Sequence, residues 1–368
     1  MHVVVLGGYG NFGARICRAL ARNPQIEVTA AARNPEDGAR RARLDSCIRS
    51  ARLDLSASDF AVALRRLSPS IVVHCAGPFQ GQDYRVAQAS IAAGAHYVDL
   101  ADGRAFVARF AEQLDAAASS AGVLAVSGAS TLPALSSAVV DALLGRFREL
   151  HEIRTIIAPA QRTPRGAATL AGVLSYAGRP FRWLSAGRWV EAHGWQEIAR
   201  LHMGGLRDRW AAACDVPDLE LFPARYPSVR TVEFRAALEL RIEHAALWAA
   251  GGLRRAGLPL PLERWAGLLE RAASLLNVFG SERGGMQVSL TGVRHDGRHS
   301  RIDWTVLANG NHGPEIPCMA AVLTTNKIAS GALSVRGALP CMGLVALHEY
   351  APEFERWAMT TAIEETPA

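Results

Sequence analysis

Four side chains capable of acid–base chemistry lie in one short stretch, HYVDLAD, at residues 96–102. They are His96, Tyr97, Asp99 and Asp102, of which Tyr97, Asp99 and Asp102 are the predicted catalytic residues. A phenol or a carboxylate at the end of a strand can bind a substrate amine or exchange a proton with a substrate. The two aspartates are also typical helix caps, Asp102 especially because it directly precedes GRAFVARF. The sequence leaves both roles open, and it places either Tyr97 or its neighbour His96 in the core.

A second group of residues suits phosphate binding. The chain opens with the apolar run HVVVL, then GGYGNFG, then ARICRALA, which has helical spacing. Gly8, Gly10 and Gly13 form the G-x-G-x-x-G fingerprint between a strand and a helix. In this fingerprint the first glycine permits a tight turn, the second lets the backbone approach the pyrophosphate, and the third allows the helix to pack closely on the strand. The helix N-terminus offers N–H groups to the phosphates. The predicted cofactor-binding residues of this loop are Gly7, Gly8, Tyr9, Gly10, Asn11, Phe12 and Gly13.

The end of the second apolar run, EVTAAARNP, indicates which dinucleotide binds. An NAD site usually carries Asp or Glu there to bond the ribose 2′-hydroxyl, and this run has neither. Arg33 stands at that point, and a guanidinium pairs well with a 2′-phosphate. We therefore predict NADP, with NAD as the less favoured cofactor. Asp54, at the end of a weaker strand, either contacts the adenine or forms a turn.

The fourth predicted strand, counting the weaker one at 47–55, ends in HCAGPFQ. Ligands of open α/β sheets bind beyond the carboxyl ends of the strands. We therefore predict that Ala76, Gly77, Pro78 and Phe79 carry the chain past the pyrophosphate and the nicotinamide ribose.

Three further residues are candidates for substrate contact. Thr131 follows the sixth apolar run, where it contacts a substrate or caps the next helix. Arg162 and Arg165 lie in the loop APAQRTPRGAATL, which leads into a helix. That combination suits a carboxylate or another anionic group, so we predict a small-molecule substrate, and this loop favours an anionic one. The alternative is an exposed basic loop.

The elements that position these residues alternate through the first third of the chain. Short apolar runs at 2–8, 26–33, 71–77, 96–102 and 123–130 are separated by stretches with helical spacing, and a weaker strand is expected at 47–55. This alternation predicts βαβ units, hence a Rossmann-type, doubly wound parallel sheet with helices on both faces.

The regular alternation of strands and helices ends at about residue 148. HEIRTIIAPA predicts a strand, and helices are expected at 167–176, 238–255 and 262–276. Two alternating runs joined through Asp296-Gly297 predict an antiparallel hairpin. The predicted domains are a dinucleotide-binding domain at 1–148, a substrate and dimerisation domain of α+β type at 149–317, and a helix and tail at 318–368 that return to the first domain.

Composition narrows the classes of partner. The 40 basic and 34 acidic residues are interspersed, for a net charge of +6, which gives no argument for nucleic acid. The histidines form no metal-ligand pattern, so no metal is predicted. Six scattered cysteines without a C-x-x-C pair, and no signal segment, predict a cytoplasmic protein. The Trp- and Arg-rich helices between Leu238 and Leu276 suit a dimer interface or core better than a membrane surface.

Several motifs together resemble the saccharopine dehydrogenase-like oxidoreductases. They are GGYGNFG, the A-G-P-F of residues 76–79, the following stretch AAGAHYVD at 92–99, and the tail GALPCMGLVALHEY at 337–350. The resemblance covers about the first 140 residues closely and the remainder in outline. It implies a Rossmann domain joined to an α+β domain that closes over the nicotinamide, commonly in a homodimer.

The expected function is an NADP-dependent hydride transfer to or from an imine, carbonyl or enoyl bond of a small molecule. The family resemblance leaves the substrate open. Since no proton donor is unambiguous in the sequence, a catalytically silent NADP-binding sensor or regulatory protein is the alternative.

Overall fold

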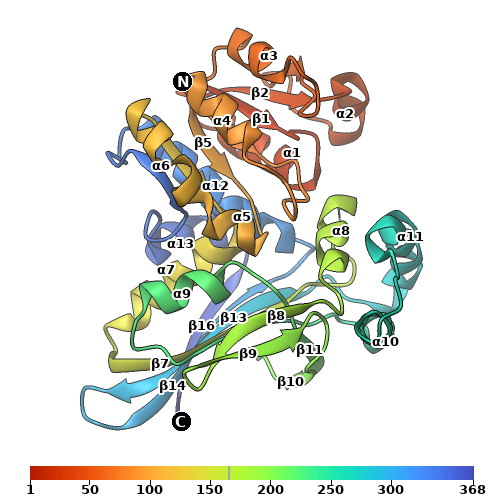
Figure 1. Cartoon of the computed structure of the whole chain (residues 1–368), viewed down its shortest axis with the longest axis vertical. Helices are drawn as coiled ribbons and strands as arrows, with labels where there is room; N and C mark the ends of the chain where they lie inside the picture. Colours follow the sequence, from red (N-terminus) through yellow and green to blue (C-terminus); the bar gives the residue numbers. More distant parts are fainter. Residues whose placement is uncertain (165) are drawn as a thin grey trace. The chain divides into compact units, whose positions relative to one another are not determined.

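The computed structural model describes residues 1–164 and 166–368, and the chain divides into two compact units (Figure 1). Unit 1 comprises Met1–Leu135 and Pro314–Val345, and unit 2 comprises Ser136–Gly313 and Ala346–Ala368. The expected boundaries were 148/149 and 317/318. The division falls elsewhere because the chain crosses between the units just before the helix at 136–144, and because the C-terminal residues are shared between two sheets.

Unit 1 contains the predicted parallel sheet. Its seven strands lie in the order β15-β6-β5-β4-β1-β2-β3, and every pairing is parallel. The strands are β1 (His2–Leu6), β2 (Glu27–Ala32), β3 (Arg49–Arg52), β4 (Ile71–His74), β5 (His96–Asp99), β6 (Leu124–Ser127) and β15 (Gly337–Pro340). β1, β4 and β6 are almost entirely buried, as expected for short apolar runs covered on both faces.

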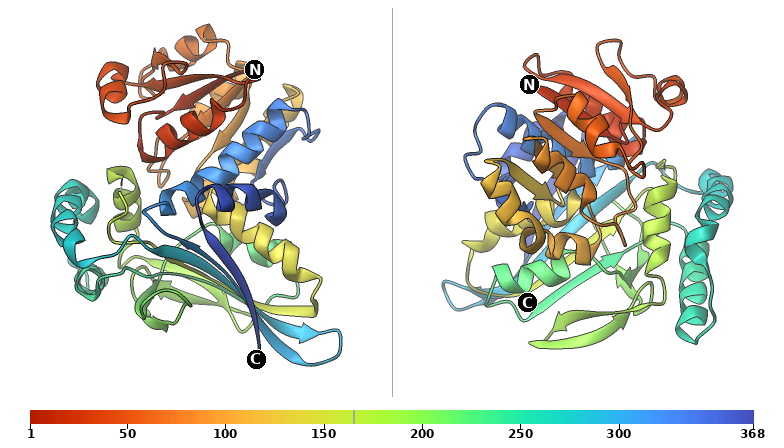
Figure 2. Two further views of the ribbon diagram at one scale, coloured as in Figure 1. Left: turned by 180° about the vertical axis from the view of Figure 1, so that it is seen from behind. Right: turned by 45° about the horizontal axis from the view of Figure 1, so that its top comes forward.

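The helices of unit 1 form two layers. One layer contains α1 (Asn11–Leu20) beside α12 (Ile316–Ala329), and the other contains α3 (Phe60–Arg66), α4 (Arg85–Ala92) and α6 (Phe110–Ser120) (Figure 2). Arg15 of α1 forms an ion pair with Glu315, the N-cap of α12, and Asn23, just beyond α1, forms a 2.9 Å hydrogen bond with Asn326 of α12. Unit 1 also contains α2 (Pro35–Ala42), α5 (Arg104–Ala108) and the π-type turn η1 (Thr131–Leu135). The predicted doubly wound fold is confirmed.

Unit 2 is built on a mixed sheet of nine strands. Its main path is β10-β11-β12-β7-β13-β14-β16; β8 pairs with β12, and β9 pairs with β8. The strands are β7 (Phe147–Ala158), β8 (Pro180–Ser185), β9 (Arg188–His193), β10 (Ala199–Leu201), β11 (Arg209–Ala213), β12 (Thr231–Ala236), β13 (Gly284–Arg294), β14 (His299–Ala308) and β16 (Thr360–Pro367). β13 and β14 form the expected antiparallel hairpin, with Gly297 at φ +85° in the connection.

Helices pack on this second sheet in two groups. The first group, α7 (Ser136–Leu144), α9 (Asp218–Arg225) and α13 (Leu347–Arg356), contacts the sheet or a neighbouring helix of the group. The second consists of α8 (Ala167–Ser175), α10 (Arg241–Arg255), the 3-10 turns η2 (Leu262–Trp265) and η3 (Leu276–Phe279), and α11 (Ala266–Leu275). Among the described residues, no helix is long and apolar enough to cross a membrane.

The C-terminal residues are divided between the two sheets. β15 pairs with β6 in unit 1, whereas β16 pairs with β14 in unit 2. The whole of 318–368 was expected to pack on the first domain. Residues from Ala346 onward instead belong to unit 2, because β16 completes the edge of its sheet.

Candidate functional site

The glycine loop of unit 1 is closely packed. Gly7 has φ +75°, and a Cβ built on Gly8 would lie 2.8 Å from the Ala30 Cβ of β2. A Cβ on Gly13 would lie 2.2 Å from the Gly7 carbonyl oxygen, so the first turn of α1 contacts the loop through bare backbone. On Gly10 a Cβ would approach only that same carbonyl, at 3.2 Å. The loop therefore has the three glycine roles of the dinucleotide fingerprint, with Gly10 as the open position.

Helix α1 begins directly after this loop. Gly10 is its N-cap, in an extended conformation, and Asn11, Phe12 and Gly13 form its first turn. The first N–H groups of a helix have no partner within the helix and lie at the positive end of its dipole. This end of α1 is therefore suited to a pyrophosphate.

Tyr9 extends from the loop toward the second and third strands. Its ring packs so closely on Gly38 of α2 that a Cβ there would lie 2.5 Å from the ring. Its hydroxyl donates to Ser50 Oγ of β3 at 2.7 Å. Gly38 and Ser50 were not predicted, since neither belongs to a recognisable motif.

Arg33 and Asp54 lie beyond the ends of β2 and β3. Arg33 is exposed, and Asp54 Oδ1 accepts hydrogen bonds from Ser56 N at 3.0 Å and Ser56 Oγ at 2.6 Å. These bonds, with the charges of Arg33 and Arg52, hold the pKa of Asp54 below its usual value. Asp54 thus forms the turn that was one of its two expected roles. Arg52, which belongs to no recognisable motif, places a second guanidinium beside Asp54.

The A-G-P-F turn adjoins the glycine loop. β1 and β4 are neighbouring parallel strands, and a Cβ on Gly7 would lie 3.1 Å from Ala76 N. Gln82 Nε2 donates to the carbonyls of Ala76 at 3.0 Å and Pro78 at 2.7 Å, which braces the turn. Two segments 70 residues apart thus meet at the carboxyl ends of their strands, where ligands of such sheets bind.

Phe79 ends this turn in the core, whereas Gly77 and Pro78 lie at the surface. The Phe79 ring packs edge-on against His74, with centroids 5.0 Å apart. The Gly77–Pro78 peptide bond is cis. Ala76, Gly77 and Pro78 are partly or fully exposed, so they are the members of the motif that a bound dinucleotide can contact.

Tyr97 and Asp99 lie in the interior of unit 1. Asp99 Oδ1 accepts hydrogen bonds from Gly128 N at 2.8 Å, Ala101 N at 2.9 Å and Ser127 Oγ at 3.0 Å. The carboxylate therefore joins the carboxyl ends of β5 and β6. Burial raises the pKa of Asp99 to about 6, although these hydrogen bonds act in the opposite direction.

The Tyr97 hydroxyl lies 2.9 Å from His74 Nδ1. Burial lowers the pKa of His74 to about 4, so the imidazole is neutral at pH 7. Burial and the Asp99 charge raise the pKa of Tyr97. Tyr97, His74 and Asp99 have at most 1% of their surface exposed, so their contacts position the strand ends. A catalytic role for Tyr97 and Asp99 stays a prediction.

Asp102 is the most accessible of the three predicted catalytic residues. It is exposed, and its Oδ1 accepts a 3.1 Å hydrogen bond from Gln80 Nε2, two residues beyond Pro78. Desolvation by the surrounding protein raises its pKa above the usual value. Gly103 is the N-cap of α5 and no side chain caps that helix, so Asp102 does not fill the capping role considered for it. Its position after β5 places it at the same edge of the sheet as the two loops.

The predicted substrate contacts are less favourably placed. Thr131 begins η1 in unit 1 and is 9% exposed. Arg162 lies in unit 2, where its Nε donates to the Asn277 carbonyl at 3.1 Å and its Nη1 lies 3.8 Å from Glu282. Its guanidinium is thus already partly engaged. Arg165 lies outside the described residues.

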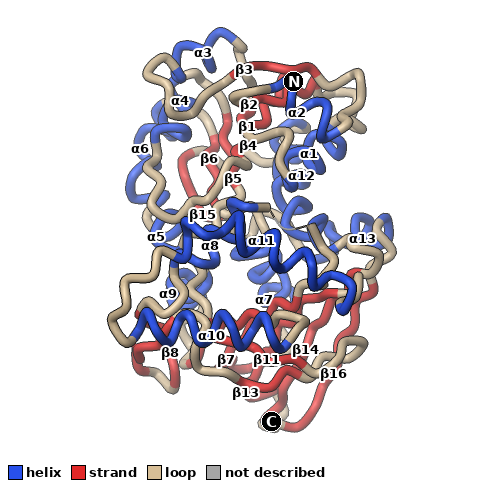
Figure 3. The backbone as a smooth tube through the Cα atoms, turned by 90° about the vertical axis from the view of Figure 1, so that its right-hand side faces the viewer, coloured by secondary structure: helices blue, strands red, loops and turns tan. Residues whose placement is uncertain are grey.

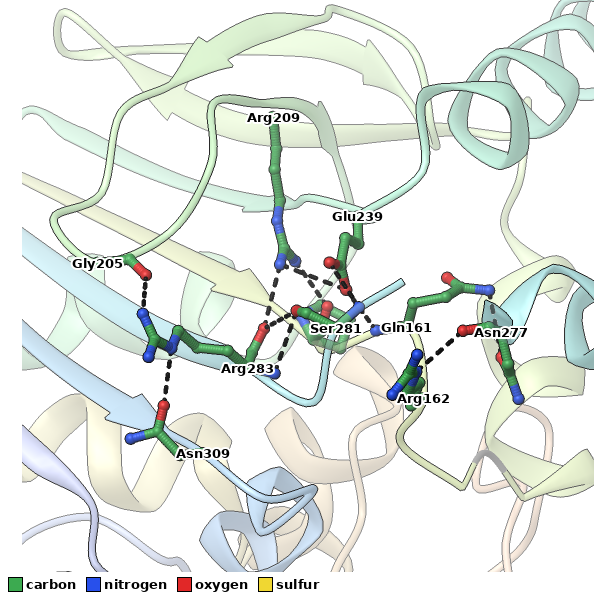
Figure 4. Close-up of polar contacts among 10 residues, drawn as sticks. Gln161, Arg162, Gly205, Arg209, Glu239, Asn277, Ser281, Arg283 and Asn309 are labelled. Atoms are coloured by element: carbon green, nitrogen blue, oxygen red, sulfur yellow. Dashed lines mark hydrogen bonds and ion pairs between the residues drawn. The ribbon is translucent and has the colours of Figure 1, made fainter. Parts of the chain in front are cut away.

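A polar network surrounds Arg162 at the end of β7 (Figure 4). The buried Arg209 guanidinium donates to the carbonyls of Pro159 at 2.6 Å and Arg283 at 3.2 Å, and lies 3.7 Å from Glu239. The Glu239 carboxylate accepts from Gln161 N at 2.7 Å and Ser281 N at 2.9 Å. This network holds the loop that leads to Arg162, and the sequence offered no local signal for it.

Among the described residues, no three His, Cys, Asp or Glu side chains gather in a way that could hold a metal ion. The local geometry of unit 1 favours a dinucleotide on its own evidence. The glycine loop, the N-terminus of α1 and the A-G-P-F turn all fit it.

Comparison with known proteins agrees with this geometry. Residues 3–126 match the family described as the saccharopine dehydrogenase NADP binding domain. Comparison with curated proteins gave no significant match.

Two solved structures share the fold over nearly the whole chain. An apo saccharopine dehydrogenase (L-Glu forming) from Saccharomyces cerevisiae has a TM-score of 0.69 and 12% identity, with 99% of each chain covered. A homospermidine synthase from Legionella pneumophila, in complex with NAD, has a TM-score of 0.64 and 9% identity, with 99% of this chain and 91% of that chain covered. At these identities the likeness concerns the fold. Together with the match at residues 3–126, it supports the predicted resemblance: residues 3–126 match the saccharopine dehydrogenase NADP binding domain, and the whole chain shares the fold of these two proteins.

Proposed function

We propose that this protein is an NADP-dependent oxidoreductase that transfers a hydride to or from a carbon–nitrogen double bond of a small molecule. The observation that carries the proposal is the meeting of three segments at one edge of the unit 1 sheet. Gly7 adjoins Ala76, and Asp102 accepts a hydrogen bond from Gln80 just beyond the A-G-P-F turn. A dinucleotide-binding loop and an exposed carboxyl group thus share the carboxyl ends of β1, β4 and β5.

Asp102 is the proposed acid–base group. A raised pKa allows a carboxyl group to hold a proton closer to neutral pH, which favours proton donation. A nicotinamide bound at this edge supplies or accepts the hydride. In the reducing direction, Asp102 gives a proton to the substrate nitrogen while carbon receives the hydride, and solvent then reprotonates the carboxylate. Gln80 keeps the carboxylate oriented through its hydrogen bond.

The choice of an imine over a carbonyl or enoyl bond rests on the names of two fold relatives. One is a saccharopine dehydrogenase and the other a homospermidine synthase, and both names denote amines. Once Asp102 has given its proton to the nitrogen, it is left as a carboxylate, and this negative charge stabilises the protonated imine. Carbonyl and enoyl substrates remain the comparison compounds for the test.

The test is NADPH oxidation with amine and keto-acid pairs, which form imines in solution, against simple ketones and enoyl thioesters. We expect turnover with one class of imine. The Asp102→Asn protein should keep its affinity for NADPH and lose about 100-fold or more in kcat, the range of general acid catalysis. Wild-type activity that Asp102→Asn leaves unchanged would remove Asp102 from the mechanism.

NADP preference is proposed from Arg33, with Arg52 beside it. An exposed guanidinium at the end of β2 forms charge-assisted bonds with a 2′-phosphate, each contributing about 1.5–3 kcal/mol. Arg33→Asp should therefore weaken NADPH binding by about 10- to 100-fold in calorimetry and leave NADH binding almost unchanged. Arg66→Asp is the matched control, because Arg66 is an exposed arginine on α3 of the same unit. Equal weakening of both dinucleotides by Arg33→Asp would contradict the assignment.

A catalytically silent NADP-binding protein is the second candidate. The observation that favours it is the burial of Tyr97 and Asp99, which leaves Asp102 as the accessible member of the predicted catalytic set. Tight NADPH binding without turnover across the whole panel would support this alternative. A Gly13→Val protein, whose side chain would meet the Gly7 carbonyl, should bind neither dinucleotide in either case.

A further inference from the structure

The side chain of Gln80, directly after the A-G-P-F turn, has one amide atom in use and one without a partner. Its Nε2 donates a 3.1 Å hydrogen bond to Asp102 Oδ1. A carboxyl oxygen accepts hydrogen bonds, so this contact fixes the orientation of the amide, and it does so for protonated Asp102 as well when the proton lies on Oδ2. Gln80 Oε1 is shielded from water and has no hydrogen-bond partner. The structure therefore holds an oriented acceptor that lacks a donor.

An acceptor of this kind calls for a ligand. Buried polar atoms in folded proteins are almost always hydrogen-bonded, and one left unpaired destabilises the fold. Gln80 is half-buried, and it follows β4 at the edge of the sheet where ligands of open α/β sheets bind. A bound molecule with an N–H group at this position would supply the missing donor.

The order of the strands indicates which half of a dinucleotide lies near Gln80. In the sheet, β4 lies between β1 and β5 (Figure 3). The chain continues from β1 through β2 to β3 on one side, and from β4 through β5 to β6 on the other, so the strand order reverses between β1 and β4. A dinucleotide binds across such a reversal, with its pyrophosphate at the N-terminus of the first helix.

The two halves of the dinucleotide then extend in opposite directions from the glycine loop. Arg33, proposed to bind the 2′-phosphate, follows β2, so the adenosine half extends toward β2 and the nicotinamide half toward β4 and β5. The ends of β4 and β5 are closely packed, because a Cβ on Gly103 would lie 3.3 Å from the Phe79 carbonyl oxygen and 3.4 Å from Gln80 N. The carboxamide of the nicotinamide carries an N–H2 group, which is the kind of donor that Gln80 Oε1 lacks.

We propose that Gln80 is a positioning residue whose Oε1 accepts a hydrogen bond from the nicotinamide carboxamide while its Nε2 holds Asp102. One amide would thus orient both the nicotinamide ring and the proton donor. This inference rests on the proposed function, because it takes a dinucleotide as the ligand and Asp102 as the acid–base group. An N–H group of the substrate has the same chemistry, and the experiments below distinguish the two donors.

The first measurement compares the affinity of the wild-type protein for NADPH and for two analogues by calorimetry. The reduced 3-acetylpyridine analogue has a methyl group in place of the carboxamide N–H2 and would leave Gln80 Oε1 unpaired. The reduced thionicotinamide analogue keeps the N–H2 group and changes the carbonyl oxygen to sulfur. We expect the acetylpyridine analogue to bind about 10-fold more weakly than NADPH, as for one lost hydrogen bond to a buried acceptor. The thionicotinamide analogue should bind nearly as well as NADPH.

Two substitutions of Gln80 test whether its oxygen causes this preference. Gln80→Met removes the acceptor at a similar side-chain length, so NADPH and the acetylpyridine analogue should bind equally well. Gln80→Glu keeps an oxygen acceptor, so this protein should keep the preference for the carboxamide. Gln113→Met is the matched control and should behave as the wild type, because Gln113 is an exposed glutamine on α6 of the same unit.

The pH profile of kcat tests the contact with Asp102. In the reducing direction Asp102 must be protonated, so kcat falls as the pH rises through its pKa. Gln80→Glu replaces the N–H2 donor with a second carboxyl group, which raises the pKa of Asp102 further. The fall in kcat should therefore occur at a higher pH in this protein than in the wild type, whereas Gln113→Met should not move it.

Three results would overturn this inference and leave the proposed function intact. They are a wild-type protein that does not distinguish NADPH from the acetylpyridine analogue, a Gln80→Met protein that still does, and a Gln80→Met protein changed only in its KM for the substrate. The last result would assign the donor to the substrate. A wild-type protein that binds neither NADPH nor NADH would instead remove the proposed function. If circular dichroism shows that Gln80→Met is misfolded, the wild-type comparison and Gln80→Glu decide.

Discussion

Asp99 in unit 1 and Glu239 in unit 2 are both carboxylates that accept hydrogen bonds from backbone N–H groups, but their surroundings differ. Asp99 receives neutral donors, from Gly128, Ala101 and Ser127, within 29 residues of itself. Glu239 receives two backbone donors and also faces the buried guanidinium of Arg209. The partners of Glu239 are 30, 42 and 78 residues away in the chain.

The difference shows two ways of joining loops at the end of a sheet. In unit 1, parallel strands bring consecutive βα connections to one edge, so a single carboxylate can join neighbouring loops with neutral hydrogen bonds. In unit 2, a mixed sheet brings distant loops together. The ion pair between Arg209 and Glu239 holds them, together with the hydrogen bonds that Arg209 donates to backbone carbonyls. We therefore expect unit 2 to depend on its charge pair more strongly than unit 1 depends on Asp99.

The largest expected effect is that of Arg209→Met. It removes the donors to the Pro159 and Arg283 carbonyls and leaves Glu239 buried without its cation. Breaking a buried pair in this way costs about 3–5 kcal/mol. All eight tryptophans lie in unit 2, so the tryptophan fluorescence signal in a urea titration follows that unit.

The double variant Arg209→Met with Glu239→Gln is the control for this prediction. It removes the stranded charge and keeps an acceptor for Gln161 N or Ser281 N. We expect it to recover part of the lost stability. A double variant less stable than Arg209→Met alone would show that the cost arises from packing.

The matching change in unit 1 is Asp99→Ala, which we expect to lower the free energy of unfolding of unit 1 by about 2–3 kcal/mol. It leaves the buried N–H groups of Ala101 and Gly128 without an acceptor, and each stranded group costs about 1–3 kcal/mol. Far-UV circular dichroism should show a destabilised transition that tryptophan fluorescence does not follow. If both signals shift together, the two units unfold as one, and the comparison fails.

The third prediction concerns pH. The pKa of Asp99 is raised to about 6, so the folded protein favours the protonated carboxyl group. The stability that this protonated group contributes to unit 1 is lost as the pH rises from about 4 to above 6. The pKa of His74 is lowered to about 4, so its contribution is lost as the pH falls from 6.5 toward 4. The two trends oppose each other in the wild type.

Asp99→Asn removes one of these trends. The difference in free energy of unfolding between Asp99→Asn and the wild type should shift by about 2 kcal/mol in favour of Asp99→Asn between pH 4.5 and pH 7. This size is expected for a shift of about two pKa units. Thermal unfolding of both proteins at several pH values measures this difference. A constant difference across the range would mean that Asp99 titrates normally.

The smallest expected effect is that of Tyr97→Phe, which should lower the free energy of unfolding of unit 1 by about 1 kcal/mol. It removes the hydroxyl that lies 2.9 Å from His74 Nδ1 and leaves a neutral buried nitrogen without that partner. The measurement is the thermal midpoint of unit 1 at pH 7, where His74 is neutral. NADPH affinity should be unchanged, because Tyr97 is completely buried; a large loss of affinity would place Tyr97 in the binding site.

Much of unit 1 was predictable from local pattern. The apolar runs, the helical stretches between them and the glycine spacing all depend on residues close in sequence. β1 to β6 formed where strands were expected, whereas β15 was not anticipated. The connection at Gly297 was predictable for the same reason. In unit 2, the tryptophan-rich stretch gave no such signal, and it forms β8 to β11, which were not anticipated.

The candidate site shows the same division. Gly7 to Gly13, Arg33 and the A-G-P-F turn could be selected from the sequence, because each follows a recognisable strand. The partners Gln80 and Gln82, the second guanidinium of Arg52 and the burial of Tyr97 could not. A side chain's partner across two loops depends on strand order and register, which periodicity does not encode.

By itself, the sequence determined that the chain begins with a βαβ dinucleotide fold, because glycine geometry and hydrophobic periodicity are local properties. Only the tertiary structure decided that Asp99 is enclosed while Asp102 is accessible, that Arg209 meets Glu239, and that Gln80 bonds to Asp102. These outcomes depend on which distant segments the folded chain brings together, and therefore on packing and loop closure.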